Sequence, residues 1–170
     1  ENVSLGVSSL RAYGLEEDLL DEIGSVRATG LTFAPEAGTQ RMRDVINKNV
    51  TEEQLLETAD RVFSRGWSKM KLYFMIGLPE ERDEDVVAIA RLAKRCLSTA
   101  RRALPPGKGS VAINLGASTF VPKPFTPFQW EPMERVESLN KKLRFVEKAI
   151  KKIGNMNLID DLPKWEHVQA

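Results

Sequence analysis

Cysteine and histidine are nearly absent from this sequence, and their scarcity excludes several kinds of site. Cys96 is the one cysteine and His167 the one histidine among 170 residues. A single thiol cannot form an internal disulfide, which is typical of a protein from the reducing cytoplasm. One Cys and one distant His cannot hold a metal of the common Cys/His type, and a lone His near the end cannot serve a Ser/His/Asp triad.

Long apolar runs and a dominant charge are also missing. No segment is apolar enough for a membrane span, and the start shows no secretory signal pattern. The net charge of +1 favours neither nucleic acid nor a membrane surface. The phosphate-binding patterns GxxxxGK[ST] and GxGxxG do not occur. Because the sequence starts at Glu1 in a strand-like run, without Met, we expect a domain of a longer protein.

Apolar segments alternate with helical patterns along the chain, which predicts an α/β fold with a parallel sheet. The expected strands are residues 3–10, 30–34, 70–76 and 110–116, each followed by a helix. Thr51 and Gln54 match a capping box at the start of one helix, and Gly66 is its expected end. A long helix is expected from Pro132 to Gly154. Units of about 30–40 residues are typical of right-handed β-α-β crossovers.

The segment from Lys71 to Glu81 is the most informative strand. Alternate residues place an apolar stripe on one face, and Tyr73 and Met75 make the other face apolar as well. A strand that is apolar on both faces is typical of a parallel sheet covered by helices. It ends abruptly in a Gly/Pro turn that carries two carboxylates, Glu80 and Glu81.

Polar or constrained residues follow each predicted strand. Because the carboxyl ends of parallel strands meet at one edge, where ligands bind, we expect these side chains around one crevice. The candidates are Arg11, Glu36, Arg41, Glu80 and Lys123.

Each candidate also has a purely structural interpretation. For Glu81 the favoured one is that it complements the dipole of the next helix. For Glu36 a ligand role is favoured, because a Pro-Glu-Ala-Gly turn is an unusual place for a solvated charge. Arg41 and Arg43 fit a solvated helix face equally well.

The segment from Thr119 to Trp130 is expected to be an extended loop, because its three prolines exclude a helix and a central strand. Its aromatic residues, Phe125, Phe128 and Trp130, are expected to pack on the rest of the fold rather than to form a stacking platform. Cys96 is expected in the core, and His167 at the surface.

Three long motifs resemble the radical S-adenosylmethionine (SAM) superfamily. They are TFAPEAGTQRMRDVINK at residues 32–48, MIGLPEE at 75–81 and FVPKPFTPFQW at 120–130. The best match is the branch of Fe–S oxidoreductases that often carries a cobalamin-binding-like domain. The resemblance implies a partial (β/α)6 TIM-like barrel with helices outside, SAM and a [4Fe–4S] cluster as cofactors, and leaves the use of cobalamin open.

The cluster-binding CxxxCxxC loop of that family is not in this sequence. The resemblance therefore implies that residues 1–154 are the C-terminal part of the barrel, with 155–170 as a tail that starts a following segment. In that case the fragment is inactive alone, and the full-length protein cleaves SAM reductively to a 5′-deoxyadenosyl radical. The sequence names no substrate.

The resemblance also implies roles for residues at the strand ends. Glu36 would contact the SAM ribose, and Arg41 or Arg43 the SAM carboxylate. The remaining positions implied around the adenine and the same rim are Ile76, Gly77, Glu80, Val121, Ser9 and Arg11.

Two other interpretations remain open at this point. One is a non-catalytic barrel module that binds RNA or a protein through the basic stretch Lys141–Lys152, Lys123 and the aromatic loop. The other is a fragment of a methylthiotransferase-like modifying enzyme. Expected partners are the remainder of the chain's own barrel and a second copy, since the strand Val3–Leu10 would leave an apolar open edge.

Overall fold

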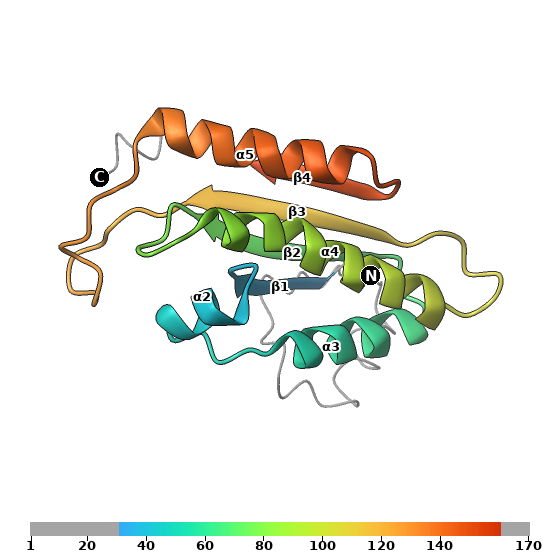
Figure 1. Ribbon diagram of the computed structural model, residues 1–170. Helices are drawn as coiled ribbons and strands as arrows, with labels where there is room; N and C mark the ends of the chain where they lie inside the picture. Colours follow the sequence, from blue (N-terminus) through green and yellow to red (C-terminus); the bar gives the residue numbers. More distant parts are fainter. Residues whose placement is uncertain (1–30, 161–170) are drawn as a thin grey trace, which may run out of the picture.

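The computed structural model describes residues 31–160, which form one four-stranded parallel sheet with helices (Figure 1). The strands are β1 (Leu31–Glu36), β2 (Lys69–Ile76), β3 (Ala112–Thr119) and β4 (Met156–Asp160). Their order in the sheet is the order in the chain, β1-β2-β3-β4. All three pairings are parallel. This arrangement confirms the predicted α/β class and the partial (β/α) barrel.

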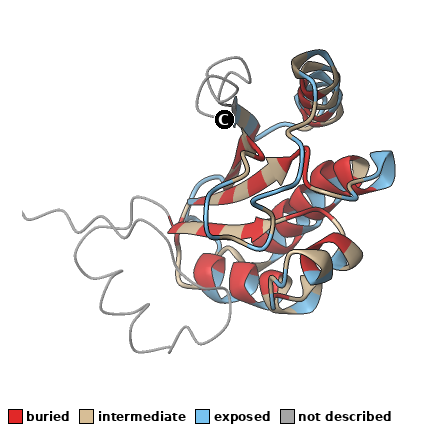
Figure 2. Cartoon of the chain, turned by 90° about the vertical axis from the view of Figure 1, so that its left-hand side faces the viewer, coloured by how far each residue is buried: buried red, intermediate tan, exposed pale blue. Residues whose placement is uncertain are grey.

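The helices lie on one side of the sheet (Figure 2). They are α2 (Gln40–Val45), α3 (Glu52–Ser64), α4 (Asp83–Ala103) and α5 (Val136–Lys151). Alternate strand residues such as Phe33, Leu72 and Leu115 are fully buried under this layer. The burial of so many large apolar side chains supplies most of the stability of such a domain.

The other face of the sheet is not covered by any helix within residues 31–160. Tyr73 and Met75 on β2 are half-buried there, and the Lys71 ammonium lies 4.9 Å from the centre of the Tyr73 ring. The apolar character of both faces of β2 therefore reflects an outer helix layer and an inner barrel face, not two helix layers.

Several local predictions are confirmed. Thr51 caps α3 through its hydroxyl, which accepts the Gln54 N–H at 3.2 Å, while Gln54 Oε1 accepts the Thr51 N–H at 2.9 Å. Cys96 is fully buried on α4, and this burial raises the pKa of its thiol to about 12. It is an inert core residue.

Other predictions differ from the structure or lie outside it. The long helix begins at Val136 instead of Pro132. The segment Met156–Asp160, to which the sequence analysis gave no element, forms β4 and pairs with β3, so the sheet continues past residue 154. The strand predicted at Val3–Leu10, the helix after it, Ser9, Arg11 and His167 all lie outside the described residues.

None of the helices within residues 31–160 combines the length and the apolar composition needed to cross a membrane.

Candidate functional site

Three loops meet at the carboxyl edge of the sheet and form what we call the rim, residues 35–39, 77–82 and 120–131. A small apolar cluster holds them together, because each loop contributes one buried side chain to it. Ala37, Leu78 and Phe120 come from the three loops in turn, and Met42 comes from α2. The rim is therefore a packed unit with its own small core, separate from the main core under the helices.

Glu36 ends β1 in a backbone conformation that is rare for a residue with a side chain. Its φ is 66°, and the next residue, Ala37, donates its N–H to the Pro35 carbonyl at 2.8 Å. Such left-handed residues are costly and cluster at functional sites. The Glu36 carboxylate accepts from Lys48 Nζ at 3.2 Å, and 22% of its side chain is exposed. The carboxylate therefore stands at the rim with one cation beside it.

Gly38 lets the first loop lie directly against α4. A Cβ at this position would lie 2.4 Å from the Ile89 nitrogen and 2.5 Å from the Asp85 carbonyl oxygen. Backbone atoms cannot move away as a flexible side chain can, so only glycine permits this approach. Thr39, which follows, caps α2 by accepting the Met42 N–H at 3.2 Å.

Asp85 connects the first loop to the second. Its carboxylate accepts hydrogen bonds from the Thr39 hydroxyl, from Arg41 Nη2 and, at 2.8 Å, from the Arg82 N–H. Only 4% of its side chain is exposed. Burial alone would raise the pKa of Asp85, but the three donors outweigh burial and lower it. The residue is thus an ionised bridge between the loops after β1 and β2.

The two arginines of α2 have different environments. Arg41 is 36% exposed in its side chain and donates from Nη2 to Asp85 and to the Glu80 carbonyl at 3.0 Å. Arg43 is buried and donates to the Ala37 carbonyl at 2.9 Å and to Gln40 Oε1 at 3.1 Å. Desolvation lowers the pKa of Arg43. Neither is a solvated helix-face residue, because Arg41 joins two loops and Arg43 supports the first loop from inside.

A buried ion pair between Glu81 and Lys142 holds the second loop against α5. Glu81 Oε2 accepts the Gly77 N–H at 2.9 Å and pairs with Lys142 Nζ of α5 at 2.7 Å. Lys142 also pairs with Glu134 at 2.6 Å. The Glu81 side chain is only 3% exposed, and burial raises its pKa, although the Lys142 and Gly77 hydrogen bonds oppose the rise. The predicted helix-dipole role of Glu81 stays a prediction, and the structure adds that its carboxylate closes the turn and pairs with α5.

The pKa of Lys142 is shifted in the direction opposite to the one that burial alone would produce. Burial lowers the pKa of an ammonium, but the Glu134 and Glu81 carboxylates outweigh burial and raise the pKa of Lys142. Gly77, at the start of the turn, has φ 74°, and a Cβ there would lie 2.6 Å from Leu139 Cδ2. Glu80 is exposed and has φ 61°.

The third loop follows β3 and contains the prolines. Phe120 donates its N–H to the Ile76 carbonyl at 2.8 Å, which ties the ends of β2 and β3. Its ring meets Phe128 edge-to-face with centroids 6.1 Å apart. Phe125 and Trp130 are 97% and 89% exposed. The prediction that all three aromatics pack on the fold is therefore wrong for Phe125 and Trp130 and confirmed for Phe128.

Several of the predicted site residues meet at this edge. Glu36, Ile76, Gly77 and Glu80 lie at the ends of β1 and β2, and Val121 and Lys123 follow β3, so the structure puts them on one rim. Arg41 reaches the same rim from α2, whereas Arg43 lies beneath it. Asp85 and Lys142 also belong to the rim network, although neither was predicted to contribute to the rim.

A metal site of the protein's own is not formed by residues 31–160. No group of three or more His, Cys, Asp or Glu side chains in this part of the chain is arranged to hold an ion. A [4Fe–4S] cluster bound by three cysteines does not fit the sequence either, because Cys96 is the one cysteine and is buried on α4. The rim can therefore offer polar contacts and an apolar wall, but no cluster ligand.

The fold defines a class, namely (β/α) partial-barrel proteins with a parallel sheet whose loops gather at its carboxyl edge. The comparison with protein families gives the particular one. The model of the radical SAM superfamily matches residues 3–93. The chain belongs to the radical SAM superfamily.

A relative shows how much of a longer protein the chain matches. The chain is 35% identical over 152 residues to the uncharacterized protein MJ0966 of Methanocaldococcus jannaschii. The match covers 89% of this chain and 31% of that protein, so the chain spans about a third of its relative's length.

Proposed function

We propose that this chain supplies part of the SAM-binding rim of a radical SAM domain, within a longer protein that cleaves SAM. The family membership and the match to 31% of a longer relative support the proposal. The observation that carries it is the joined rim, in which the loops after β1 and β2 are fixed to each other by Asp85 and Arg41. A ligand that contacts several loops needs such a preorganised edge.

Glu36 is the proposed contact of the ribose. A carboxylate is an acceptor for two hydroxyl donors, and Glu36 is partly exposed at the end of β1 with a single cation at 3.2 Å. Its left-handed backbone, which the Gly38 approach to α4 and the Arg43 bond to Ala37 hold in place, aims the residue out of the strand.

Arg41, and not Arg43, is the proposed partner of the SAM carboxylate. A guanidinium fork suits a carboxylate because two parallel N–H groups can meet both oxygens. Arg41 bonds through Nη2, and no hydrogen bond of its Nη1 or Nε to a described residue is found. Arg43 donates from Nη1 to the turn and from Nη2 to Gln40, and it lies beneath the surface with its buried Nε unpartnered among the described residues.

The adenine would lie along the ends of β2 and β3. Ile76 and Gly77 end β2, the Phe120 N–H bonds to the Ile76 carbonyl, and Val121 follows half-buried. These residues offer backbone edges and an apolar wall. Glu80, exposed at the next turn, supplies a carboxylate at the same edge.

SAM, when bound with a reduced [4Fe–4S] cluster, supplies the chemistry implied for the family. It would supply a radical that abstracts hydrogen from a substrate, and Glu36, Arg41, Ile76 and Gly77 would be the residues of this chain that hold SAM. Because this chain has one buried cysteine, no part in the formation of that radical is assigned to it. Its own share is to bind and orient SAM.

The test uses a longer protein that contains this chain within a complete barrel. After anaerobic reconstitution with iron and sulfide, we expect the visible absorbance of an iron–sulfur cluster and the release of 5′-deoxyadenosine on reduction with SAM present. A protein that lacks a cysteine triad upstream of this chain, or that forms no cluster and no 5′-deoxyadenosine, would contradict the proposal.

A further inference from the structure

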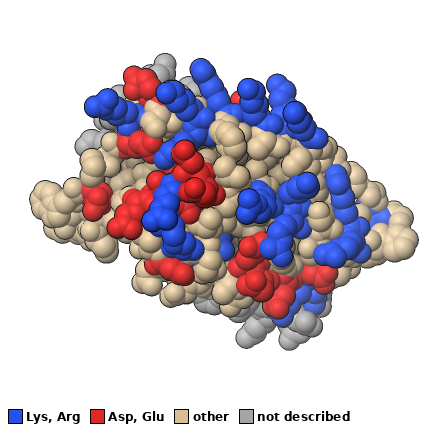
Figure 3. All heavy atoms as spheres, viewed as in Figure 1, with Lys and Arg blue, Asp and Glu red and all other residues tan. Residues whose placement is uncertain are grey.

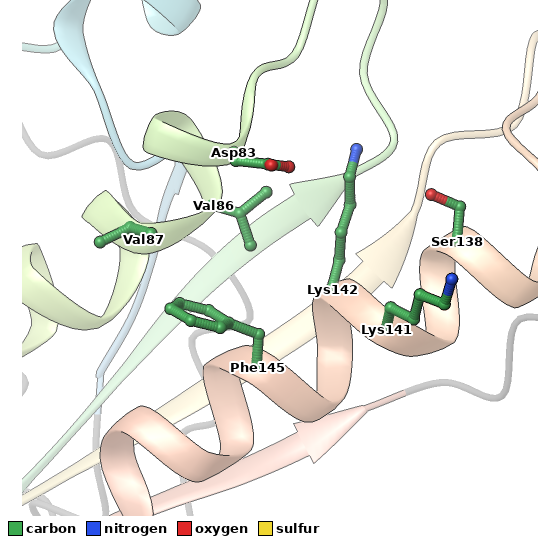
Figure 4. Close-up of a pocket in the computed structure, with 7 residues that line it drawn as sticks. All are labelled: Asp83, Val86, Val87, Ser138, Lys141, Lys142 and Phe145. Atoms are coloured by element: carbon green, nitrogen blue, oxygen red, sulfur yellow. The ribbon is translucent and has the colours of Figure 1, made fainter.

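A groove runs between α4 and α5 on the outside of the domain, away from the inner face of the sheet (Figure 4). Its volume is about 310 Å³. Phe145 extends from α5 toward Val86 and Val87 on α4, and Lys141 and Lys142 line the α5 side. The Phe145 residue is 47% exposed, so an aromatic ring stands open to solvent in the middle of this groove.

Positive charge is concentrated on α5 and on the outer part of α4, although the α4 cations line a separate hollow on the α3 side and Arg95 pairs with Glu52. Residues 86–103 contain five Lys and Arg and no carboxylate, and residues 138–152 contain six and one. The whole chain nevertheless has a net charge of only +1. Figure 3 shows these cations gathered over α5 and α4. The near-neutral composition therefore hides a strongly basic outer face.

Four of the cations along α5 have no carboxylate partner among residues 31–160. Lys141, Arg144, Lys148 and Lys151 form no ion pair with any carboxylate in the described part of the chain, in contrast to Lys142. Their spacing of three, four and three residues puts them on one stripe, roughly 15 Å long at the rise of an α-helix. The stripe borders a second hollow of about 560 Å³ beside Phe145, in which Glu147 is the one acidic lining residue.

Four unpaired like charges in a row weaken a helix unless an anion neutralises them. A basic stripe along α5, with one open aromatic beside it, matches the way single-stranded nucleic acid is bound. Lys and Arg follow the phosphates, and an aromatic ring stacks on a base. An acidic amphipathic protein helix fits less well, because it would need a longer apolar floor than Val86, Val87 and Phe145 provide.

We propose that the α4–α5 groove and its flanking cations bind single-stranded nucleic acid, with Phe145 stacking on a base. This inference rests on the charge pattern and the groove and not on the SAM rim. Asp83 and Ser138 lie at the end of the groove nearest the rim, since α4 and α5 both begin there. A bound strand would therefore pass close to the loops at the carboxyl edge.

The test measures binding of a 5′-fluorescein-labelled 20-residue oligouridylate to the full 170-residue chain by fluorescence anisotropy. If about six phosphates are neutralised, the logarithm of the binding constant should fall with the logarithm of the salt concentration with a slope of about −4. This slope corresponds to a loss of about 300-fold between 50 and 200 mM salt.

Matched variants locate the surface. Lys148→Gln with Lys151→Gln should make the salt slope shallower by about 1.4, since each removed contact contributes about 0.7. Arg61→Gln with Lys108→Gln removes two exposed cations that do not line the groove and should leave the slope unchanged. Phe145→Ala should weaken binding about tenfold through lost stacking. Glu147→Gln should strengthen it roughly threefold by removing a repelling charge.

Three results would overturn the proposal. The first is no binding at 50 mM salt by a chain with an unchanged thermal unfolding curve. The second is an equal effect of the two double variants, which would mean diffuse charge attraction. The third is equally tight binding of a labelled polyglutamate peptide, which would assign the face to an acidic protein partner instead.

Discussion

Asp85 is the residue of the rim network at which a small substitution should cost the most stability. It is the common acceptor of Thr39, Arg41 and the Arg82 N–H. Asp85→Asn should lower the free energy of unfolding by about 2–3 kcal/mol, because hydrogen bonds to a charged group are lost in a buried place. Asp83→Asn, an exposed change two residues earlier, should cost less than about 0.5 kcal/mol. Urea unfolding monitored by circular dichroism measures both.

The pH dependence of this loss has a definite sign. The folded pKa of Asp85 lies below its ordinary value of 3.8. Its stabilising contribution is therefore present above the unfolded pKa and disappears as the pH falls through the folded pKa. The difference in unfolding free energy between the wild type and Asp85→Asn should shrink below about pH 4. A difference that stays constant from pH 7 to pH 3 would mean that the carboxylate charge is not involved.

The Glu81–Lys142 pair gives a second prediction at the residue scale. Lys142→Met leaves the buried Glu81 carboxylate without its cation and should cost about 3 kcal/mol at pH 7. The pKa of Glu81 is already raised above 4.5, and removal of Lys142 raises it further. As the pH falls through the raised pKa of Glu81 in the folded state, the folded state takes up a proton before the unfolded state does. The cost of Lys142→Met should therefore decrease.

Urea unfolding at pH 7 and pH 4 checks this expectation. Lys141→Met, at the neighbouring position, removes a cation with no ion-pair partner among residues 31–160 and should change stability by less than about 0.5 kcal/mol. The double change Glu81→Gln with Lys142→Met should recover part of the loss. Equal losses of unfolding free energy in Lys142→Met and Lys141→Met would show that the Glu81–Lys142 pair does not hold the second loop.

At the scale of elements, the β2–α4 turn depends on Gly77 for two reasons that can be separated. Gly77 has φ 74° and lies against Leu139, whereas Gly107 has φ 83° and nothing within 4 Å of an added Cβ. Gly107→Ala should therefore cost about 1 kcal/mol, the strain of the left-handed backbone alone. Gly77→Ala should cost about 3 kcal/mol, since a clash with α5 is added.

Thermal and urea unfolding of the two variants measure these costs. Leu139→Ala removes the Leu139 methyl group that the added Cβ at position 77 would meet. It should therefore lower the free energy of unfolding less in the Gly77→Ala variant than in the wild type. If Gly77→Ala and Gly107→Ala cost the same, the close packing of α5 on the turn is not what requires glycine.

The sequence patterns that predicted elements were local ones. The capping box of α3 and the alternation in β2 need only neighbouring residues, and both are confirmed. β4 was missed because Met156–Asp160 is only five residues long and Met156 is the one buried residue among residues 156–159. The start of α5 was misplaced because Pro132 can open a helix, but the chain becomes helical only after Arg135.

The site was predictable only in its location. The ends of consecutive parallel strands had to share an edge, and Glu36 and Glu80 could be assigned to it. The network that fixes the rim depends on partners far away in sequence, since Arg41 is 44 residues from Asp85 and Glu81 is 61 from Lys142. An acidic residue at the start of a helix has a sufficient local explanation, which hid the tertiary role of Asp85 and Glu81.

At the scale of the whole molecule, self-association through the strand predicted at Val3–Leu10 stays a prediction, as this segment lies outside the described residues. An unpaired apolar edge strand pairs readily with a second copy. The chain should show a concentration-dependent dimer in sedimentation velocity, and Val7→Lys, which puts a charge on that strand, should shift it to monomer. A monomer at all concentrations would contradict the expectation.

The central claim is that the rim binds SAM, and Glu36 tests it most directly. In the reconstituted longer protein, the dependence of 5′-deoxyadenosine formation on SAM concentration gives the KM for SAM. Glu36→Gln should raise this KM about tenfold, because a charged acceptor of ribose hydroxyls is lost. Glu57→Gln, an exposed carboxylate on α3, should leave it unchanged. An unchanged KM in Glu36→Gln, in a protein that still folds and forms its cluster, would contradict the account.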